Sequence, residues 1–278
     1  MEKIIRAVQE SKRTKTKQNE VSGLAKKIIL PPTSNKTEND VVNIKYEKTR
    51  VISLNPEHLA KNRIVSFNKN INLSLGFDIL RTQVIKKMDE NGWRTIAITS
   101  PVPVCGKTMV SINLAMSIAH LINRTAMLID FDFRRPSVAK YLGLPSSGST
   151  LNNVLLGEAS IAEALVNPGL ERLVILPTLK PVKHSSEVLS SAKVDNLIRE
   201  VRDRYAERII IFDLPPLLSS DDAMIMLSKV DCVLVVMGNG IISKTDLIES
   251  MRYIDSDKLL GTVLNKSNSQ QSKGDHYY

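Results

Sequence analysis

The chain is poor in cysteine and in aromatic residues. Its 278 residues include two cysteines, Cys105 and Cys232, one tryptophan, and 4% aromatic residues in all. So little cysteine excludes a disulfide-stapled fold and indicates a reducing, cytoplasmic setting. Hydrophobic residues nevertheless make up 42% of the chain, which is enough for a sizeable core. The composition therefore predicts a globular protein.

Long hydrophobic runs are also absent. No stretch approaches the roughly 20 apolar residues that a membrane-spanning helix requires, because the apolar runs are short and bounded by charge. The start of the chain lacks the charged flank, apolar core and small-residue cleavage site of a signal peptide. We therefore predict a cytoplasmic protein that associates with the inner face of the membrane only through a partner.

Positive charge is concentrated near the start of the sequence. The net charge is +9, and residues 1–66 contribute fourteen basic against seven acidic side chains, while the remaining body is close to neutral. This distribution disfavours a basic surface for nucleic acid, and we predict no nucleic-acid partner. Residues 1–50 have few apolar residues and are predicted to form a disordered basic arm, either solvated or in contact with an anionic partner or membrane.

Apolar periodicity predicts the elements of the body. In residues 51–94, an N-terminal extension, apolar residues recur at helical spacing from Leu73 to Met88 and predict an amphipathic helix. In residues 95–266, short β-branched runs alternate with helical stretches; the runs are TIAITS, TAMLID, LVILP, RIIIF, CVLVVM and LLGTVL. This alternation predicts an α/β fold with a doubly wound, mainly parallel sheet flanked by helices, in which ligands bind beyond the carboxyl ends of the strands.

The stretch TSPVPVCGKTMV, from Thr99 to Val110, follows the first of these strands and opens the next helix. Gly106, Lys107 and Thr108 match the end of a phosphate-binding loop (P-loop), in which a helix N-terminus and a lysine hold phosphates. The first glycine of the pattern is replaced by Pro101. Val104 and Cys105 are bulkier than the glycine-containing pair common there, and they restrict backbone conformations that glycine enters freely.

Acidic residues follow two other strands. TAMLID ends at Asp130 and continues as FDFRRP, so Asp130 and Asp132 alternate and point to one side of an extended chain, and Asp213 follows RIIIF. Carboxylates beside a phosphate site suit a magnesium ligand and a proton acceptor. Arg134 and Arg135 could contact phosphate, a neighbouring subunit or solvent. The three elements together predict nucleotide binding.

These residues resemble the bacterial tyrosine kinases (BY-kinases) of capsule and exopolysaccharide loci, within the larger MinD/ParA-type group of P-loop ATPases. The resemblance covers about Leu73 to Lys266 and rests on four segments, ITSPVPVCGKT, LIDFDFRRP, FDLPP and GTVLNK. The opening MEKIIRAVQES is similar to the subgroup encoded beside exosortase-linked genes. The resemblance implies a P-loop kinase domain over residues 95–266.

Site roles follow from the resemblance, residue by residue. It implies that ATP is bound by Gly106, Lys107, Thr108, Met109 and Asn265, the last at the place where family members contact the base. It also implies that Mg²⁺ is held by Thr108, Asp132 and Asp213. Lys107 and Asp130 would be catalytic, with Asp130 accepting the proton of an attacking tyrosine hydroxyl.

The end of the sequence carries the expected phosphoacceptors. Residues 267–278 are polar and predict a flexible tail, and the family's C-terminal tyrosine cluster corresponds here to Tyr277 and Tyr278. The resemblance therefore implies an ATP-dependent protein-tyrosine autokinase that regulates exopolysaccharide biosynthesis and phosphorylates this tail in trans, in a homo-oligomer. Its activator would be a separate membrane-embedded chain-length (copolymerase) protein.

The sequence also departs from the family pattern. Leu75 and Asp78 occupy two positions where charged residues are expected for ring assembly, and only Arg81 is retained, which puts a ring-shaped oligomer in doubt. Val102 replaces the signature lysine of MinD/ParA ATPases and so favours the kinase branch. Two alternatives stay open, a MinD/ParA-type ATPase switch and a degenerate nucleotide-binding adaptor without kinase activity.

Overall fold

A computed structural model of the chain describes residues 49–68 and 72–267. The described residues belong to one unit that begins at Val41. Most of the predicted arm and tail lies outside the described residues, and so do the expected phosphoacceptors Tyr277 and Tyr278.

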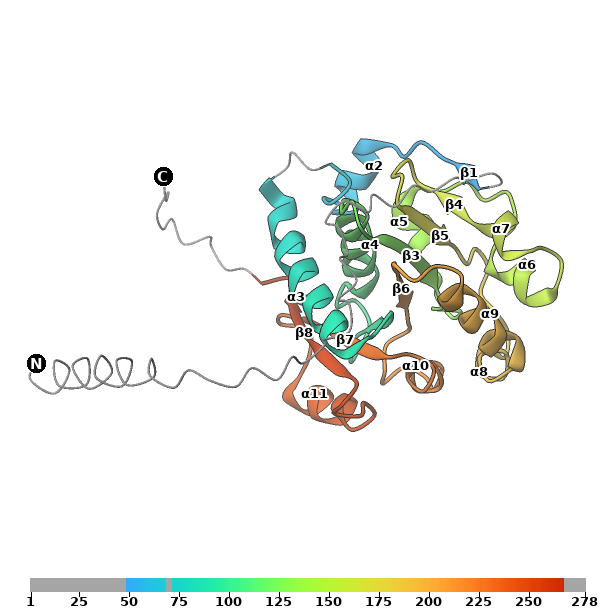
Figure 1. Cartoon of the computed structure of the whole chain (residues 1–278). Helices are drawn as coiled ribbons and strands as arrows, with labels where there is room; N and C mark the ends of the chain where they lie inside the picture. Colours follow the sequence, from blue (N-terminus) through green and yellow to red (C-terminus); the bar gives the residue numbers. More distant parts are fainter. Residues whose placement is uncertain (1–48, 69–71, 268–278) are drawn as a thin grey trace, which may run out of the picture. The chain divides into compact units, whose positions relative to one another are not determined.

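An eight-stranded sheet organises the described residues (Figure 1). Its spatial order is β1-β4-β5-β3-β6-β2-β7-β8. All neighbouring pairs are parallel except β4 and β5. The strands are β1 (Arg50–Val51), β2 (Thr95–Thr99), β3 (Thr125–Asp130), β4 (Val166–Asn167), β5 (Leu173–Leu176), β6 (Arg208–Asp213), β7 (Cys232–Gly238) and β8 (Leu259–Asn265). The six predicted strands are confirmed, and the mainly parallel sheet with them.

Helices cover both faces of the sheet. One hydrophobic cluster takes Ile96 and Ile98 of β2, while the intervening Ala97 belongs to the cluster on the opposite face. The first cluster packs against α2 (Pro56–Lys61), α3 (Leu75–Asn91), α4 (Lys107–Ala119) and α5 (Val138–Leu142). The second packs against α6 (Leu151–Leu156), α7 (Ile161–Ala164), α8 (Ser185–Leu189), α9 (Ala192–Asp203) and α10 (Asp222–Leu227), and Met251 of α11 (Lys244–Met251) lies at its edge. Alternate residues of β2 therefore belong to clusters on opposite faces of the sheet, and each cluster is covered by helices. This confirms the doubly wound arrangement.

The helix predicted from Leu73 to Met88 is α3, which begins two residues later. Val84 and Met88 have exposed fractions of 0%, which confirms the apolar face. The place expected for Leu73 was wrong, because it lies in the 3₁₀ turn η1 (Asn72–Ser74) and is 67% exposed. The helix ends at Gly92, whose φ of +67° is one that glycine adopts without strain.

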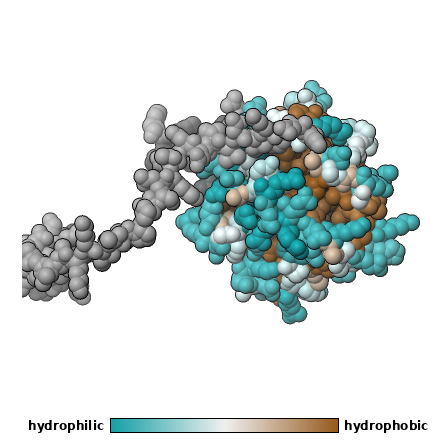
Figure 2. Space-filling view, turned by 45° about the vertical axis from the view of Figure 1, so that its right-hand side comes forward, coloured by the Kyte–Doolittle hydropathy of each residue, from teal (hydrophilic) through white to brown (hydrophobic). Residues whose placement is uncertain are grey.

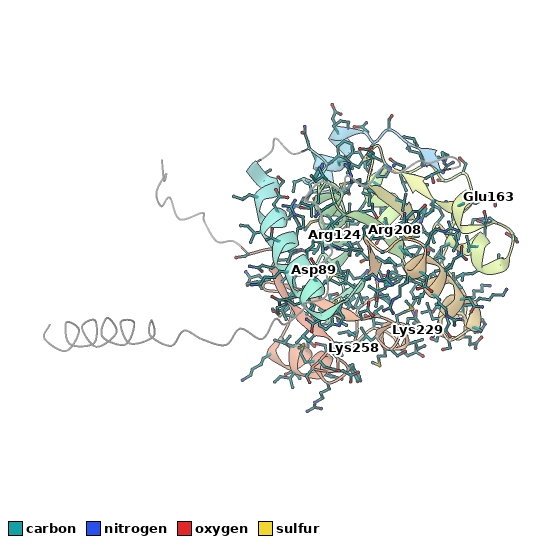
Figure 3. All side chains as sticks on the ribbon, viewed as in Figure 1. Asp89, Arg124, Glu163, Arg208, Lys229 and Lys258 are labelled. Carbon is teal, nitrogen blue, oxygen red and sulfur yellow. The ribbon has the colours of Figure 1, made fainter. Side chains whose placement is uncertain are left out.

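Polar contacts hold the segments that enter the strands. Arg124, directly before β3, donates from one guanidinium nitrogen to both carboxylate oxygens of Asp89 in α3, each at 2.9 Å (Figure 3). Lys229, shortly before β7, pairs with Asp195 of α9, and Lys258, directly before β8, donates to the carbonyl of Leu227 at 3.0 Å. These contacts lie at the amino ends of the strands, which leaves the carboxyl ends for ligands.

The surface drawn in Figure 2 is mostly hydrophilic, and hydrophobic residues show mainly in recesses between hydrophilic ones. Within the described residues, no helix is both long and apolar enough to cross a bilayer.

A buried asparagine anchors the segment between α2 and α3. The Asn113 side chain in α4 is fully buried; its oxygen accepts from the backbone N–H groups of Val65 and Ser66, at 2.8 and 2.9 Å. Its amide nitrogen donates to the carbonyls of Arg63 and Met109, at 3.0 and 2.9 Å. Arg63 has a φ of +58°, a costly conformation for a non-glycine residue that these bonds help to hold. One side chain thus ties this segment to the helix that begins at the P-loop.

We predict that Asn113→Ala lowers the free energy of unfolding by about 2–4 kcal/mol, because four backbone groups lose a buried partner. Urea denaturation would measure the loss. Asn91→Ala, at the exposed end of α3, is the matched control and should change stability by less than about 0.5 kcal/mol. Equal effects of the two substitutions would contradict the anchoring role.

Candidate functional site

A loop of seven residues joins β2 to α4 and begins the site. Gly106 precedes α4 with a φ of +94°, and a Cβ at this position would lie 2.2 Å from the amide nitrogen of Asn265. That nitrogen donates to the carbonyl of Cys105 at 2.8 Å, so the end of β8 is joined to the loop. Glycine is therefore required at position 106 by both the backbone conformation and the close approach of Asn265.

The loop contains one strained position. Val104 has a φ of +67° and is 73% exposed, although a β-branched side chain strongly disfavours this conformation. Its neighbour Cys105 is fully buried. The sequence predicts that Val104 and Cys105 restrict the backbone, and the strained backbone of Val104 confirms this for the first of the two residues. Strain of this kind persists only where surrounding contacts impose it.

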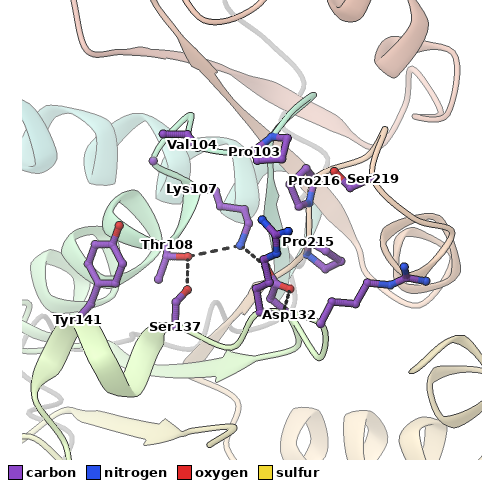
Figure 4. A pocket seen from close by; sticks show the side chains of 13 residues that line it. Pro103, Val104, Lys107, Thr108, Asp132, Ser137, Tyr141, Pro215, Pro216 and Ser219 are labelled. Carbon is purple, nitrogen blue, oxygen red and sulfur yellow. Dashed lines mark hydrogen bonds and ion pairs between the residues drawn. The ribbon is translucent and has the colours of Figure 1, made fainter. Parts of the chain in front are cut away.

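Lys107 lies between two carboxylates. Its ammonium nitrogen is 2.8 Å from Oδ2 of Asp132 (Figure 4). The same nitrogen is 3.6 Å from Oδ2 of Asp213, and the lysine side chain is only 11% exposed. Burial lowers the pKa of Lys107, but the charges of Asp213 and Asp132 together outweigh it and place the pKa above its usual value. The lysine is therefore held as a cation.

Hydroxyl groups complete the bonding of Asp213. Thr108 donates to Oδ2 of Asp213 at 2.6 Å, and Ser111 donates to Oδ1 at 3.0 Å. The Thr108 hydroxyl also lies 3.1 Å from the hydroxyl of Ser137. Burial, with a contribution from the charge of Asp132, raises the pKa of Asp213, although Lys107 and Thr108 oppose the rise.

Asp130 is enclosed by backbone donors. Its Oδ1 accepts from the N–H of Asp132 at 3.1 Å, and its Oδ2 accepts from those of Ser137 and Val138, at 2.9 and 3.0 Å. Burial raises its pKa to about 8, with a contribution from Asp213, while the Val138 N–H opposes the rise. The carboxylate therefore shapes the turn that follows β3.

Two adjacent cavities lie over the loop. The first, of about 380 Å³, is lined by Gly106, Lys107, Thr108 and Asp132 among others (Figure 4). The second, of about 310 Å³, is lined by Gly106, Met109 and Asn265 among others. All of the predicted site residues within the described chain therefore converge at the carboxyl edge of the sheet, with Asp130 and Asp213 buried behind the lining of the first cavity.

The two arginines after Asp132 differ in their contacts, although both line the first cavity. Arg134 pairs with the buried carboxylate of Asp222 at 3.2 Å and with Asp221 at 3.7 Å. Ser186 of α8 donates to both of these carboxylates, at 2.7 and 2.8 Å. Arg135 makes no side-chain ion pair or hydrogen bond with the residues that the structure describes. Of these two arginines, only Arg135 has a guanidinium that no acidic side chain of the described residues pairs with.

Sequence reasoning missed several residues of the site. Ser111 lies four residues after Lys107, so the helical repeat would place it on the same face. Pro215, Pro216 and Ser219 line the first cavity, and Pro215 also accepts a 2.7 Å hydrogen bond from Thr99. Ser137 had no comparable signal, because its contact with Thr108 depends on how the turn after β3 folds back.

The donor set fits Mg²⁺ bound together with phosphates. No group of three His, Cys, Asp or Glu side chains that could hold a metal by itself occurs among the described residues. Three buried acidic side chains nevertheless lie around one ammonium, and the pKa values of Asp130 and Asp213 are raised, so a divalent cation would stabilise their ionised forms. Mg²⁺ commonly takes one or two carboxylates and completes its shell with water and phosphate oxygens. Thr108, Asp132 and Asp213 would hold it here.

Relief of the strain at Val104 should be measurable. Val104→Gly is expected to raise the free energy of unfolding by about 0.5–1 kcal/mol, because glycine adopts a positive φ without steric cost. Val102→Gly is the control in the same loop, and because Val102 has no positive φ it should lower stability instead. Thermal and urea unfolding would give both values, and a loss of stability in Val104→Gly would refute the strain.

Comparisons with known proteins agree with this geometry. The sequence profile of the family described as "AAA domain" matches residues 93–259, more than half of the chain. The putative tyrosine-protein kinase CapB of Staphylococcus aureus is 26% identical over 209 residues, covering 74% of this chain and 90% of CapB. Tyrosine-protein kinase CpsD of Streptococcus pneumoniae serotype 4 is 31% identical over 175 residues, covering 62% of this chain and 76% of CpsD.

Solved structures share the fold. The VpsO kinase domain matches with a TM-score of 0.61 and 27% identity, covering 70% of this chain and 96% of that domain. The septum site-determining protein MinD of Pyrococcus horikoshii, complexed with Mg-ADP, matches with a TM-score of 0.52 and 24% identity, covering 64% of this chain and 72% of MinD. The chain belongs to the AAA domain family of P-loop proteins and, within it, to the tyrosine-protein kinases of bacterial capsule and exopolysaccharide loci.

Proposed function

We propose that this protein is an ATP-dependent protein-tyrosine autokinase that regulates exopolysaccharide or capsular polysaccharide biosynthesis. The observation that carries the proposal is the contact of Lys107 with Asp132 and Asp213 at the wall of a cavity of about 380 Å³, which Lys107 and Asp132 line. Phosphoryl transfer requires positioned phosphates, a neutralising charge and an oriented nucleophile, and these residue types supply them. The family to which the chain belongs supports the same activity.

The P-loop residues would bind the phosphates of ATP. Gly106 and the first residues of α4 line the cavity. The free N–H groups at the N-terminus of a helix favour bound anions. The Lys107 ammonium would exchange part of its contact with Asp132 for phosphate oxygens. Mg²⁺, when held by Thr108, Asp132 and Asp213, would neutralise charge on the transferring group.

The proton of the attacking tyrosine needs an acceptor, and we propose Asp130. Burial raises its pKa above that of an ordinary aspartate, which makes its carboxylate a stronger base. Its enclosure by three N–H donors requires that the turn from Asp132 to Val138 shift when nucleotide and tyrosine bind. Asp130 would act late in the reaction, as charge leaves the hydroxyl.

The acceptors would be Tyr277 and Tyr278 of a neighbouring copy, phosphorylated in trans. Arg81, the one retained residue of the ring-assembly pattern, is bonded to Asp78 at 2.9 Å and to the Ser117 hydroxyl at 3.2 Å within its own chain. Arg81 is therefore engaged within its own chain, and the proposed homo-oligomer does not depend on a contact from Arg81 to a neighbouring copy. The activator would be a membrane-embedded chain-length protein acting in trans, which would bring this kinase to the inner face of the membrane.

Phosphotyrosine mapping tests the proposed activity. The full chain is incubated with Mg-ATP, with and without peptides from the cytoplasmic part of a candidate chain-length protein, and analysed by mass spectrometry. We expect phosphate on Tyr277 or Tyr278, and at least a hundredfold less in Lys107→Met, because the phosphates lose their cation. Tyr277→Phe with Tyr278→Phe should remove the signal while leaving ATP binding unchanged.

Two results would favour a different function for this protein. ATP hydrolysis without phosphotyrosine, in either the presence or absence of the peptides, would favour an ATPase switch of the MinD/ParA type. ATP binding without hydrolysis or phosphotyrosine under the same conditions would favour a nucleotide-binding adaptor.

A further inference from the structure

Tyr141 stands where the two cavities over the P-loop meet. The cavities share three lining residues, Val104, Gly106 and Tyr141. The first carries the phosphate-binding residues, and the second extends toward Met109 and Asn265. Val104 and Gly106 belong to the loop itself, so Tyr141, from α5, forms the shared wall opposite the loop.

The phenol hydroxyl of Tyr141 is available to a ligand. It forms no hydrogen bond with any residue in the part of the chain that the structure describes, although the side chain is half-buried. The hydroxyl oxygen is not among the buried polar atoms that lack a partner in the described residues, so it is open to the cavity rather than sealed in the protein. Figure 4 shows the ring on the cavity wall with its hydroxyl end directed toward the loop that carries Val104.

The backbone below Tyr141 is fixed to the site. Its N–H donates to the carbonyl of Ser137 at 2.9 Å, and the Ser137 hydroxyl lies 3.1 Å from that of Thr108. On the other side of α5, the carbonyl of Lys140 contacts the His58 ring at 2.9 Å, and Gly143 ends the helix against the same ring. The backbone of Tyr141 is therefore held in a set position relative to the phosphate-binding loop.

We infer that Tyr141 positions the nucleoside of the bound nucleotide, with its ring against the ribose and its hydroxyl donating to a ribose oxygen. Triphosphate bound at Lys107 and Thr108 in the first cavity would then continue past Tyr141, and the base would lie in the second cavity toward Met109 and Asn265. The assignment rests on the nucleotide binding in the proposed function. It adds a contact from α5 that distinguishes a nucleotide from a bare polyphosphate.

Comparison of two ligands tests this contact. Calorimetric titration of the full chain with ATP and with inorganic tripolyphosphate, both with Mg²⁺, separates binding of the nucleoside from binding of the phosphates. Tyr141→Ala should weaken ATP about tenfold and leave tripolyphosphate within about twofold, because it removes an aromatic surface that only the nucleoside touches. Tyr141→Phe, which lacks only the hydroxyl, should weaken ATP about threefold.

Controls separate this inference from the proposed function. Tyr253→Ala removes a 42% exposed tyrosine that lines neither cavity and should change neither affinity. Lys107→Ala should weaken both ligands, and failure of the wild type to bind ATP at all would refute nucleotide binding itself. If the wild type binds ATP and Tyr141→Ala weakens neither ligand, or weakens both equally with unchanged thermal stability, the role of Tyr141 is refuted.

Discussion

The site depends on one buried imbalance of charge. The Lys107 ammonium faces Asp132 and Asp213 at 2.8 and 3.6 Å, while Asp130 lies behind them, so three acidic side chains share one cation away from water. Burying charge is costly unless each group is paired and hydrogen-bonded. The chain offsets part of the cost with the hydroxyls of Thr108 and Ser111 on Asp213 and with backbone N–H groups on Asp130. The part of the burial cost that these bonds do not offset raises the pKa values of Asp130 and Asp213. A bound divalent cation would lower this cost.

The same constraint shapes the turn after β3. Because Asp130 accepts from the N–H groups of Asp132, Ser137 and Val138, the turn curls around its carboxylate. This curl aims Asp132 at Lys107 and brings Ser137 to Thr108, and it sets the start of α5 from which Tyr141 reaches the cavity. A carboxylate that no solvent reaches thus arranges side chains that a ligand can touch. Loss of its bonds would alter all of these contacts together, which is the behaviour of a network rather than of separate pairs.

Much of this arrangement could be predicted from the sequence, for identifiable reasons. Five of the six longer strands are short β-branched runs buried on both faces, and β8, at the edge of the sheet, is partly exposed. Their pattern is therefore strong, and Asp130 and Asp213 end two of them at the edge where ligands bind. The two-residue strands β1 and β4 carry no periodic signal and were missed. Contacts between distant segments were also beyond prediction, such as that of Arg134 with Asp222 and that of Asn113 with the segment before α3. Local composition suggested restriction at Val104, but only the tertiary contacts of the loop place its φ at +67°.

The resting contact of Lys107 has a consequence for catalysis. While its ammonium is 2.8 Å from Asp132, neither group is free for its expected ligand, since the lysine serves phosphates and the carboxylate serves Mg²⁺. Phosphate oxygens can replace the carboxylate around the ammonium, and the metal can replace the ammonium around Asp132. Each exchange makes the other less costly, because neither buried charge is then left unpaired. Binding of nucleotide and of metal should therefore reinforce each other at this site, and the strained loop at Val104 lies directly beside the groups that must exchange partners.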